Sequence, residues 1–416
     1  MTYPKISSLV DLVESAYSGG LIIVSNGSRR RVVCGVNPAT MYSVSGGRRD
    51  WESVASEFRS ILRTHGLVLG YTSFSAMSLW EKVPYRSPEP FHDLEYLGFD
   101  DFIVLNEDKA WAVGRPPEWR NIGELGSHKP RDSGAGKVVY ERPDIDGYVD
   151  IVNRAKEYIA AGEVFQVVLA RKLGVAFDGE YKAVFMRLLE MNPSPYMYYI
   201  KMGERRIIGS SPETLVRVSG RRVETYPIAG TRGVTGNPEL DQSLRRELLG
   251  SAKDAAEHVM LVDLARNDLG KVSRFGSVRV TLYRKVMKYS HVQHLVSKVV
   301  GELQEEFDSV DVFTAVFPAG TVSGAPKVRA VELIDSLEGE PRGPYAGSVG
   351  YFMGAHTMDM AINIRSLYSH GSQCVVQAGA GIVAASDPVS EYYETESKAR
   401  VVVEALGAGV GEVARL

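Results

Sequence analysis

Two pairs of acidic residues, remote from each other in sequence, have the spacing and chemistry of a metal site. Asp254 and Glu257 are three residues apart, as are Glu391 and Glu394, and both pairs lie in segments with helical periodicity. Residues three apart share one face of a helix. Carboxylates from two helices repel one another unless a cation lies between them, and Mg²⁺ prefers oxygen ligands. The pattern therefore predicts a magnesium site.

The acidic residues have two alternative interpretations, a solvated helix face and a di-iron carboxylate bundle. The first pair could form a solvated face, with ion pairs to Lys253 or Arg266 of the same helix. A di-iron carboxylate bundle requires Glu-x-x-His on two of four long helices. Here Glu257 and His258 are adjacent, and strand-like segments are too numerous for a bundle. Lys398, on the face of the second acidic pair, adds weight to a functional site.

Glycine-rich segments provide candidate ligand contacts. Residues 317–327, Phe-Pro-Ala-Gly-Thr-Val-Ser-Gly-Ala-Pro-Lys, resemble a phosphate-binding loop but lack Gly-Lys followed directly by Ser or Thr. Backbone N–H groups from Gly320 to Gly324 could still bind an anion, or the segment is a plain tight turn. Gly379 and Gly381 share one side of an expected strand, which favours close approach of a ligand or of another backbone segment, with a β-bulge as the alternative.

Two further residues could handle charge or protons. Arg365 is expected inside an otherwise apolar strand, where it needs an anionic partner such as a substrate carboxylate or a structural ion pair. His294 alternates with apolar residues, and a histidine of this kind is usually a satisfied core residue. From spacing alone, neither residue can be assigned to catalysis.

The overall composition is that of an ordinary soluble protein. The 416 residues are 44% hydrophobic and 24% charged, with a formal net charge of -3. This balance favours neither nucleic acid nor an anionic membrane as a partner. Cys34 and Cys374 have no metal-ligand spacing and predict no disulfide framework. Without a signal peptide or a membrane-spanning apolar run, the sequence predicts a cytoplasmic protein.

The pattern along the chain predicts mixed α/β layers. The turn-rich stretch 123–137 is expected to be a linker or long loop, which divides the chain into segments 1–135 and 136–416. We expect strands at 21–24, 67–71, 163–169, 206–209, 221–226, 347–352, 358–366 and 374–383, and helices at 239–264 and 389–406. Strands, then helices, then strands indicate layered sheets and helices rather than a regular βαβ series.

Read together, these segments resemble the chorismate-utilising enzymes, in particular the anthranilate synthase branch, over residues 140–405. The matching motifs are Phe-Gln-Val-Val-Leu (165–169), Asn-Pro-Ser-Pro-Tyr-Met-Tyr-Tyr (192–199), Gly-Ser-Ser-Pro-Glu (209–213), Pro-Ile-Ala-Gly-Thr-Arg (227–232), Glu-His-Val-Met-Leu-Val-Asp-Leu-Ala-Arg-Asn-Asp (257–268), the 317–327 loop, Arg-Gly-Pro-Tyr-Ala-Gly (342–347), Gln-Ala-Gly-Ala-Gly-Ile-Val (377–383) and Glu-Tyr-Tyr-Glu-Thr (391–395). The resemblance implies an α/β fold in which a two-layered β-sandwich has external helices and an active site in the cleft between its sheets.

The resemblance also implies roles for the acidic residues. It implies that Glu257 and Glu394 bind Mg²⁺, with Asp254 and Glu391 assisting through water. The metal would hold the ring carboxylate of chorismate and withdraw electrons as the 4-hydroxyl leaves. Glu213 matches the general acid that protonates this hydroxyl, which requires a raised pKa.

Other residues match the second step and the substrate contacts. His294 matches the histidine assigned to loss of a ring proton and pyruvate, and Thr321 and Gln166 complete the implied catalytic set. The implied substrate-binding residues are Thr231, Tyr345, Arg365, Gly379, Ala380, Gly381 and Lys398.

Two positions distinguish reactions within the family. Relatives that add water to chorismate carry a lysine base where this chain has Gln166, and an amide cannot deprotonate water usefully. Aminodeoxychorismate synthases commonly carry a nucleophilic lysine where this chain has Ala229. Both differences imply amination by ammonia followed by pyruvate elimination to give anthranilate. Aminodeoxychorismate synthase component I and a non-catalytic chorismate-binding subunit are the alternatives.

Ammonia and tryptophan are the remaining implied ligands. No segment resembles a glutamine amidotransferase, so the resemblance implies a separate subunit that supplies ammonia from glutamine.

The family's tryptophan-sensing Leu-Leu-Glu-Ser motif aligns with residues 22–25, with Val24 at the acidic position; Glu14-Ser15 is an alternative match. The other tryptophan-site candidates are Ser25, Pro195, Tyr196 and Met197. Loss of the carboxylate predicts weak or altered inhibition by L-tryptophan.

Overall fold

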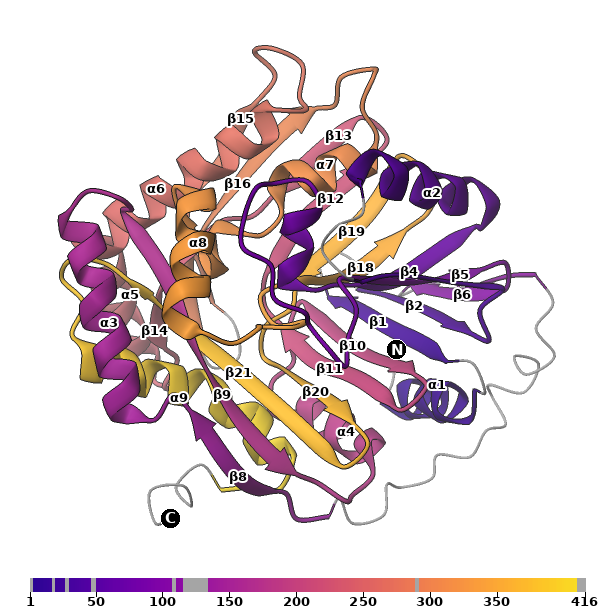
Figure 1. Cartoon of the computed structure of the whole chain (residues 1–416), viewed down its shortest axis with the longest axis horizontal. Helices are drawn as coiled ribbons and strands as arrows, with labels where there is room; N and C mark the ends of the chain where they lie inside the picture. Colours follow the sequence, from indigo (N-terminus) through magenta and orange to yellow (C-terminus); the bar gives the residue numbers. More distant parts are fainter. Residues whose placement is uncertain are drawn as a thin grey trace.

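Two antiparallel β-sheets face each other and carry helices on their outer surfaces (Figure 1). The structure, a computed structural model, describes residues 3–16, 19–26, 30–45, 50–106, 110–114, 134–288 and 292–409. Most of the predicted linker, residues 123–133, lies outside the described residues. The layered α/β fold predicted from the sequence is confirmed.

Sheet A contains 11 strands within the described residues. In spatial order they are β17 (Gly324–Ala325), β9 (Gln166–Ala176), β21 (Gln373–Ile382), β20 (Ser366–His370), β11 (Arg205–Ser211), β10 (Tyr196–Met202), β1 (Gly20–Asn26), β2 (Arg30–Val36), β6 (Phe102–Asn106) and β7 (Ala110–Val113), with β8 (Lys137–Arg142) paired to β9. In Figure 1 the indigo strands β1 and β2 continue the sheet from the magenta strands β10 and β11.

Sheet B contains 10 strands within the same described ranges. In spatial order they are β14 (Ile228–Gly233), β16 (Val292–Glu302), β13 (Arg222–Thr225), β12 (Thr214–Ser219), β19 (Thr357–Ile362), β18 (Ser348–Phe352), β4 (Leu67–Thr72), β5 (Leu94–Phe99) and β3 (Thr40–Val44), with β15 (Arg279–Lys288) paired to β16. Strands from both sides of residue 135 thus share each sheet. The division at this residue stays a prediction.

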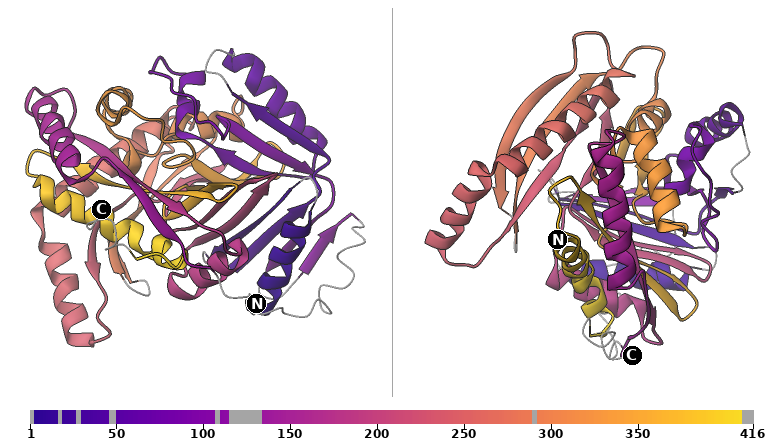
Figure 2. Two further views of the ribbon diagram at one scale, coloured as in Figure 1. Left: turned by 60° about the horizontal axis from the view of Figure 1, so that its bottom comes forward. Right: turned by 60° about the vertical axis from the view of Figure 1, so that its left-hand side comes forward.

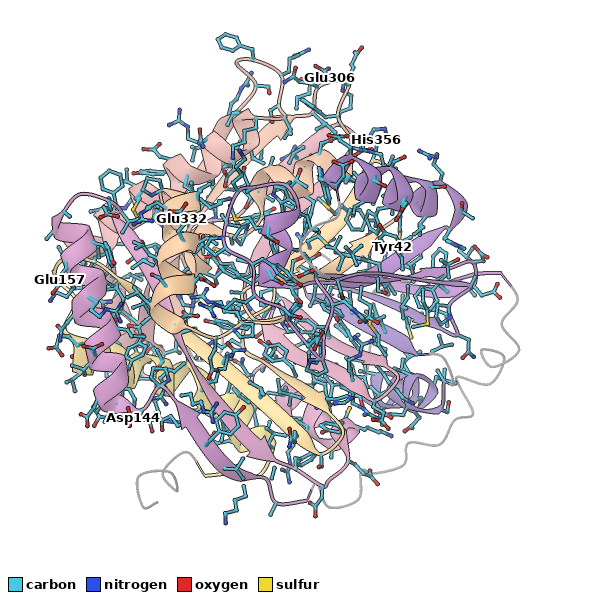
Figure 3. The ribbon with its side chains drawn as sticks, viewed as in Figure 1. Tyr42, Asp144, Glu157, Glu306, Glu332 and His356 are labelled. Carbon is cyan, nitrogen blue, oxygen red and sulfur yellow. The ribbon has the colours of Figure 1, made fainter. Side chains whose placement is uncertain are left out.

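Alternation along the strands separates two apolar cores. Tyr198 and Ile200 of β10 join the large core between the sheets, whereas Met197 and Tyr199 join the core beneath the outer helices of sheet A. This is the two-residue period of a strand with both faces buried. Side chains fill the space between the layers, while charged residues such as Glu157 lie at the rim (Figure 3).

Polar side chains also tie the sheets together across this interior. Arg205 of sheet A donates two hydrogen bonds to Glu95 of sheet B, at 2.6 and 2.7 Å. The Tyr196 hydroxyl of sheet A donates to Asp359 of sheet B at 2.6 Å. Charge-assisted bonds of this kind satisfy polar groups that would be costly to bury alone.

Helices cover the outer faces and the edge near β9. They are α1 (Tyr3–Ser15), α2 (Trp51–Thr64), α3 (Ile145–Ala160), α4 (Tyr181–Met191), α5 (Pro238–Gly250), α6 (Ala252–Gly270), α7 (Ser309–Val316), α8 (Lys327–Glu338) and α9 (Pro388–Ala405), with short 3₁₀ turns η1 (Phe74–Leu79) and η3 (Gly320–Val322). Figure 2 shows α6 running along the strands of sheet B, and α6 contacts β14 and β16. In the described part of the chain, no helix is long and apolar enough to span a membrane.

The single helix predicted over 239–264 is wrong, because the chain forms two helices that meet at Ser251. This residue has an extended backbone, with φ -69° and ψ 113°, and its hydroxyl accepts a hydrogen bond from the Asp254 N–H at 3.2 Å. A serine N-cap competes with helix continuation by satisfying a free N–H group. As a result, Asp254 lies in the first turn of α6 and Glu257 follows on the same helix.

The strand predicted over 358–366 is also wrong in extent. β19 ends at Ile362 in sheet B and β20 begins at Ser366 in sheet A, so residues 363–365 cross between the sheets. Arg365 lies in this crossing with a left-handed φ of 53°. Similarly, the strand expected from residue 163 begins at Gln166. The first boundary places Arg365 between two strands, and the second places Gln166 at the start of β9.

Candidate active site

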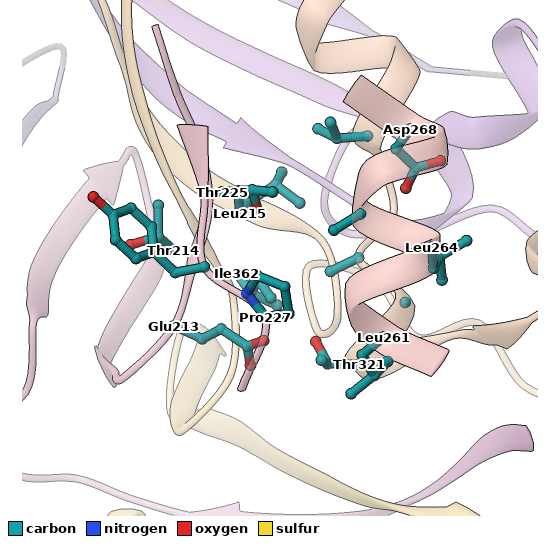
Figure 4. A pocket seen from close by; sticks show the side chains of 15 residues that line it. Glu213, Thr214, Leu215, Thr225, Pro227, Leu261, Leu264, Asp268, Thr321 and Ile362 are labelled. Atoms are coloured by element: carbon teal, nitrogen blue, oxygen red, sulfur yellow. The ribbon is translucent and has the colours of Figure 1, made fainter. Parts of the chain in front are cut away.

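Glu213 lies where the chain passes from β11 of sheet A to β12 of sheet B. It is only 8% exposed, and its carboxyl group points toward the side chain of Thr321 (Figure 4). Burial raises the pKa of Glu213 to about 8, although Thr321 and the positive charge of Lys398 act in the opposite direction. The carboxyl group is therefore protonated at neutral pH and can donate a proton.

A small cavity beside Glu213 explains this desolvation. The cavity has a volume of about 40 Å³ and lies between β12, α6 and η3. Its lining is largely apolar and includes Leu215, Pro227, Leu261 and Leu264 (Figure 4). Such walls provide little solvation for a carboxylate, so they favour the neutral acid.

His294 is held in place by the β14–β16 pair. Thr231 lies opposite His294 in the register, and its Oγ1 is 3.1 Å from His294 Nδ1. The same Nδ1 is 3.0 Å from the Gly230 carbonyl oxygen. A hydrogen on Nδ1 donated to this carbonyl puts the basic lone pair on Nε2. Burial lowers the pKa of His294, with Arg365 and Lys398 adding to the effect against the Gly230 carbonyl, so the imidazole is neutral at neutral pH.

The two acidic pairs predicted from the sequence lie on α6 and α9 and influence one another. Burial raises the pKa of Glu257, and the nearby charges of Asp254 and Glu394 raise it further, while Gln166 and Lys398 oppose the shift. Burial, together with Glu394, likewise raises the pKa of Glu391. The folded chain thus gathers these carboxylates into one electrostatic group. Part of their charge is already balanced.

Nitrogen donors provide this balance. Lys398 Nζ lies 2.6 Å from Glu394 Oε1, and Arg232 Nη2 lies 3.1 Å from Asp254 Oδ2. The Gln166 amide donates to Glu257 Oε1 at 3.3 Å. Within the described ranges, no three His, Cys, Asp or Glu side chains converge as a preformed metal site.

The glycines of β21 leave room for side chains that reach the site. A Cβ atom on Gly381 would lie 2.2 Å from Gln166 Nε2, and one on Gly379 would lie 2.8 Å from the Tyr345 hydroxyl. Ala380, between the two glycines, is fully buried in the core between the sheets. Gln166 and Tyr345 make the close approach at these glycines, together with the Leu169 carbonyl oxygen, which would lie 2.9 Å from a Cβ atom on Gly379.

Arg365 and Lys398 bring positive charge to the same place. Arg365 Nη1 donates to the Lys398 carbonyl oxygen at 2.6 Å, and Lys398 Nζ donates to the Gly379 carbonyl oxygen at 2.9 Å. Burial lowers the pKa of Arg365, although Tyr345 and Glu394 counteract it. A partly buried guanidinium in the same region as an ammonium group is suited to binding carboxylates.

The tryptophan-site candidates form a second group on β1 and β10. Ser25 is paired with Tyr196 in the register, and Arg217 Nη2 donates to Ser25 Oγ at 3.5 Å. Val24 is buried in the core beneath the outer helices.

The remaining candidates complete this description. Met197 is buried in the same core as Val24, and Pro195 directly precedes β10. The alternative motif residue Glu14 lies instead on α1, where it pairs with Arg206 at 2.8 Å. The strand position of Ser25 favours the first match.

Two contacts were not predicted from the sequence: the Arg232 pair with Asp254 and the Gly230 carbonyl contact with His294. Gly230 and Arg232 belong to the Pro-Ile-Ala-Gly-Thr-Arg motif, in which the sequence had drawn attention only to Ala229 and Thr231. The motif itself was the available signal. Their partners only become apparent once β14 is paired with β16 and packed on α6.

Comparisons with known proteins agree with this geometry. The model of the chorismate binding enzyme family matches residues 20–404. Anthranilate synthase component 1 of Aquifex aeolicus is 43% identical over 369 residues, covering 83% of this chain and 75% of the relative. Aminodeoxychorismate synthase component 1 of Bacillus subtilis is 46% identical over 364 residues, covering 82% and 77%.

A solved structure extends the agreement to the fold. Anthranilate synthase component I from Streptococcus pneumoniae superposes with a TM-score of 0.78 at 28% identity, covering 93% of each chain. The family match spans nearly all of both sheets and every residue of the candidate site. The chain therefore belongs to the chorismate binding enzyme family.

Proposed function

We propose that this chain is the chorismate-converting subunit of an anthranilate synthase. It converts chorismate and ammonia to anthranilate, pyruvate and water. The proposal rests on two residues that can transfer protons. Their surroundings shift their pKa values in opposite directions. Glu213 has a pKa of about 8 and is an acid at neutral pH, whereas the lowered pKa of His294 makes it a base. Such opposed shifts mark acid and base roles.

In the first step, ammonia adds at C2 of chorismate and the 4-hydroxyl leaves. Glu213 donates its proton to the departing oxygen, which becomes water. Gln166, at the start of β9, provides no base for activating water, so it favours ammonia as the nucleophile. In the second step, His294 removes the ring proton at C2 as the C3–O bond breaks and the ring becomes aromatic, and the departing enolpyruvate takes up a proton to become pyruvate. Thr231 and the Gly230 carbonyl hold the imidazole in place.

Substrate carboxylates have a matching set of contacts. We assign them to Arg365, Lys398 and Tyr345, together with the backbone of residues 379–381. The glycines at 379 and 381 matter because a Cβ atom at either position would enter the space of Tyr345 or Gln166. Thr321, beside Glu213, is assigned to hold the general acid in position.

Aminodeoxychorismate synthase is a second candidate, since a Bacillus subtilis relative of that name is 46% identical. This reaction would retain the pyruvyl group on the product. Ala229 on β14 has no amine with which to form a covalent adduct, which disfavours the lysine-dependent version of that chemistry. The more numerous similar relatives named anthranilate synthase component 1 support our first choice.

Magnesium fits the donor set of the acidic group. Glu257 and Glu394 would hold it, with Asp254 and Glu391 assisting through water. Mg²⁺ prefers oxygen donors of this kind. Burial and neighbouring carboxylates raise the pKa of Glu257 and Glu391, so a bound cation would stabilise their ionised forms. When bound, Mg²⁺ would polarise the ring carboxylate of chorismate. Lys398 holds Glu394 and also faces the substrate side through Gly379.

The proposal also includes a partner subunit and an inhibitor. A glutamine amidotransferase subunit supplies ammonia, because the two cysteines of this chain, Cys34 and Cys374, are buried and unsuited as glutaminase nucleophiles. L-tryptophan is a weak or altered inhibitor. Val24 provides no carboxylate for its amino group, and the neighbouring Ser25 and Tyr196 already engage Arg217 and Asp359.

The proposed reaction predicts equal production of anthranilate and pyruvate by the purified chain with chorismate, Mg²⁺ and an ammonium salt. Anthranilate fluorescence and a coupled pyruvate assay measure both products. Glutamine should replace ammonium only after an amidotransferase subunit is added. An aminated product that keeps its pyruvyl group would identify the aminodeoxychorismate reaction. Chorismate binding without turnover would instead identify a binding subunit.

Glu213→Gln should lower kcat by about 10²- to 10⁴-fold, because the amide cannot donate the acid proton. At a constant concentration of free ammonia, the wild-type rate should fall as the pH rises through about 8, where Glu213 loses its proton. The variant should lack this decline. Glu305→Gln, at an 87% exposed side chain, is the matched control. An unchanged alkaline limb in Glu213→Gln would remove Glu213 from the acid role.

Exhaustive chelation should abolish turnover, and added Mg²⁺ should restore it. Mg²⁺ should also raise the melting temperature of the wild-type chain, because a ligand that binds only the folded state stabilises it. Glu257→Gln should lose this thermal shift. Asp263→Asn, a 62% exposed carboxylate on the same helix, should keep it. Full activity after chelation would contradict the metal proposal.

The tryptophan proposal predicts that micromolar L-tryptophan leaves the ammonium-dependent rate nearly unchanged. Without the carboxylate that this motif position would provide, the site loses a partner for the ligand's ammonium group. A titration of the initial rate at chorismate concentrations near KM measures the effect. Complete inhibition in the micromolar range would show that Val24 does not weaken the site.

A further inference from the structure

A buried arginine outside the proposed reaction, Arg342, contacts several segments of the site. It follows α8 and precedes Tyr345, and it is 3% exposed. Its Nε and Nη2 atoms donate to the two carboxylate oxygens of Glu338, at 2.9 and 2.5 Å. Its charge is therefore balanced by the last residue of α8. The guanidinium also donates hydrogen bonds to two backbone carbonyl oxygens.

The backbone contacts are next to residues that we assign to the reaction. Nη1 donates to the Val322 carbonyl oxygen at 2.7 Å, directly after Thr321 in sequence. Nη2 donates to the Val168 carbonyl oxygen, also at 2.7 Å. Val168 is two residues after Gln166 and is paired with Gly381 in the register. One guanidinium group thus links η3 to β9.

The edge of β9 depends on this arrangement. β17 pairs with β9 at residues 166–167, and β8 pairs with it from residue 172 onward. Between these pairings, the Val168 carbonyl accepts from Arg342, and the Ala170 N–H donates to Glu338 at 2.8 Å. The Arg342–Glu338 pair provides side-chain partners along this stretch, where unmet backbone groups would be costly.

The guanidinium also lies over two aromatic rings. Its central carbon lies 4.6 Å from the centre of the Phe74 ring and 5.6 Å from the centre of the Tyr345 ring. A planar group with several fixed donors can serve an acid, two carbonyls and two rings at once. A lysine ammonium has the charge but not the planar fork. The site therefore depends on arginine chemistry at this position.

We propose that Arg342 is a positioning residue for the active site. It fixes Thr321, Gln166 and Tyr345 relative to one another through the Val322 and Val168 carbonyls and the Tyr345 ring. The inference rests on the proposed function, in which Tyr345 contacts the substrate, Thr321 holds Glu213 and Gln166 favours ammonia as the nucleophile. A displacement of about 1 Å in such groups can cost about 10² in rate.

The test compares Arg342→Lys with Arg205→Lys. Arg205 is also a partly buried arginine with two bonds to one carboxylate, but it ties β11 to β5 at the opposite end of β11 from Glu213. Both variants should lower the melting temperature. Well below that temperature, at saturating ammonium, only Arg342→Lys should lower kcat/KM for chorismate, by about 10²-fold with changes in both kcat and KM. Equal kcat/KM in the two variants would overturn the proposal.

A milder pair keeps the test decisive if Arg342→Lys does not fold. Phe74→Leu removes one ring from the guanidinium, whereas Phe91→Leu changes a ring that packs on Tyr71 and Tyr368. Only Phe74→Leu should lower kcat/KM, by several-fold. Wild-type kcat/KM in a folded Phe74→Leu variant would count against positioning by Arg342. Inactivity of the wild-type chain with ammonium would instead refute the proposed function.

Discussion

The site depends on a backbone constraint. A ribbon of two paired strands runs from sheet A into sheet B. β11 pairs with β20 in sheet A, and their continuations β12 and β19 pair in sheet B. The crossings are bonded to each other, with the Ser210 N–H on the Arg365 carbonyl at 3.0 Å and the Ile362 N–H on the Glu213 carbonyl at 3.1 Å. Because buried backbone groups must be paired, the crossings stay together. The crossings contain Glu213, the proposed acid, and Arg365, which is proposed to bind a substrate carboxylate.

Desolvation then gives these residues their chemical character. The same low-dielectric surroundings raise the pKa of Glu213 and Glu257 and lower the pKa of His294. Each shift favours the neutral form, so Glu213 keeps its proton and His294 stays free of one, whereas a cation bound at Glu257 would favour its ionised form. Lys398 partly counteracts the shifts of both carboxyl groups. Burial and a few fixed cations thus account for the electrostatics of the site.

The sequence was a good guide to local features and a poor guide to crossings. Helical spacing located both acidic pairs, and the glycine spacing identified one face of β21. The apolar run through Ile362 and Ile364 concealed the end of β19, because periodicity does not report which sheet a residue joins. Likewise, the Ser251 cap interrupts an otherwise continuous helical pattern. The partners of Arg232 and Arg342 depend on tertiary pairing, which local patterns do not encode.

The strand order also has a consequence for how the chain acquires its structure during synthesis. β4, complete by residue 72, has β18 as one of its neighbours, and β18 begins only at residue 348. β1 similarly requires β10, which begins at residue 196. Pairings this distant make folding slow, and early strands keep exposed edges until their partners emerge. Most of the polypeptide must therefore leave the ribosome before sheet B can close.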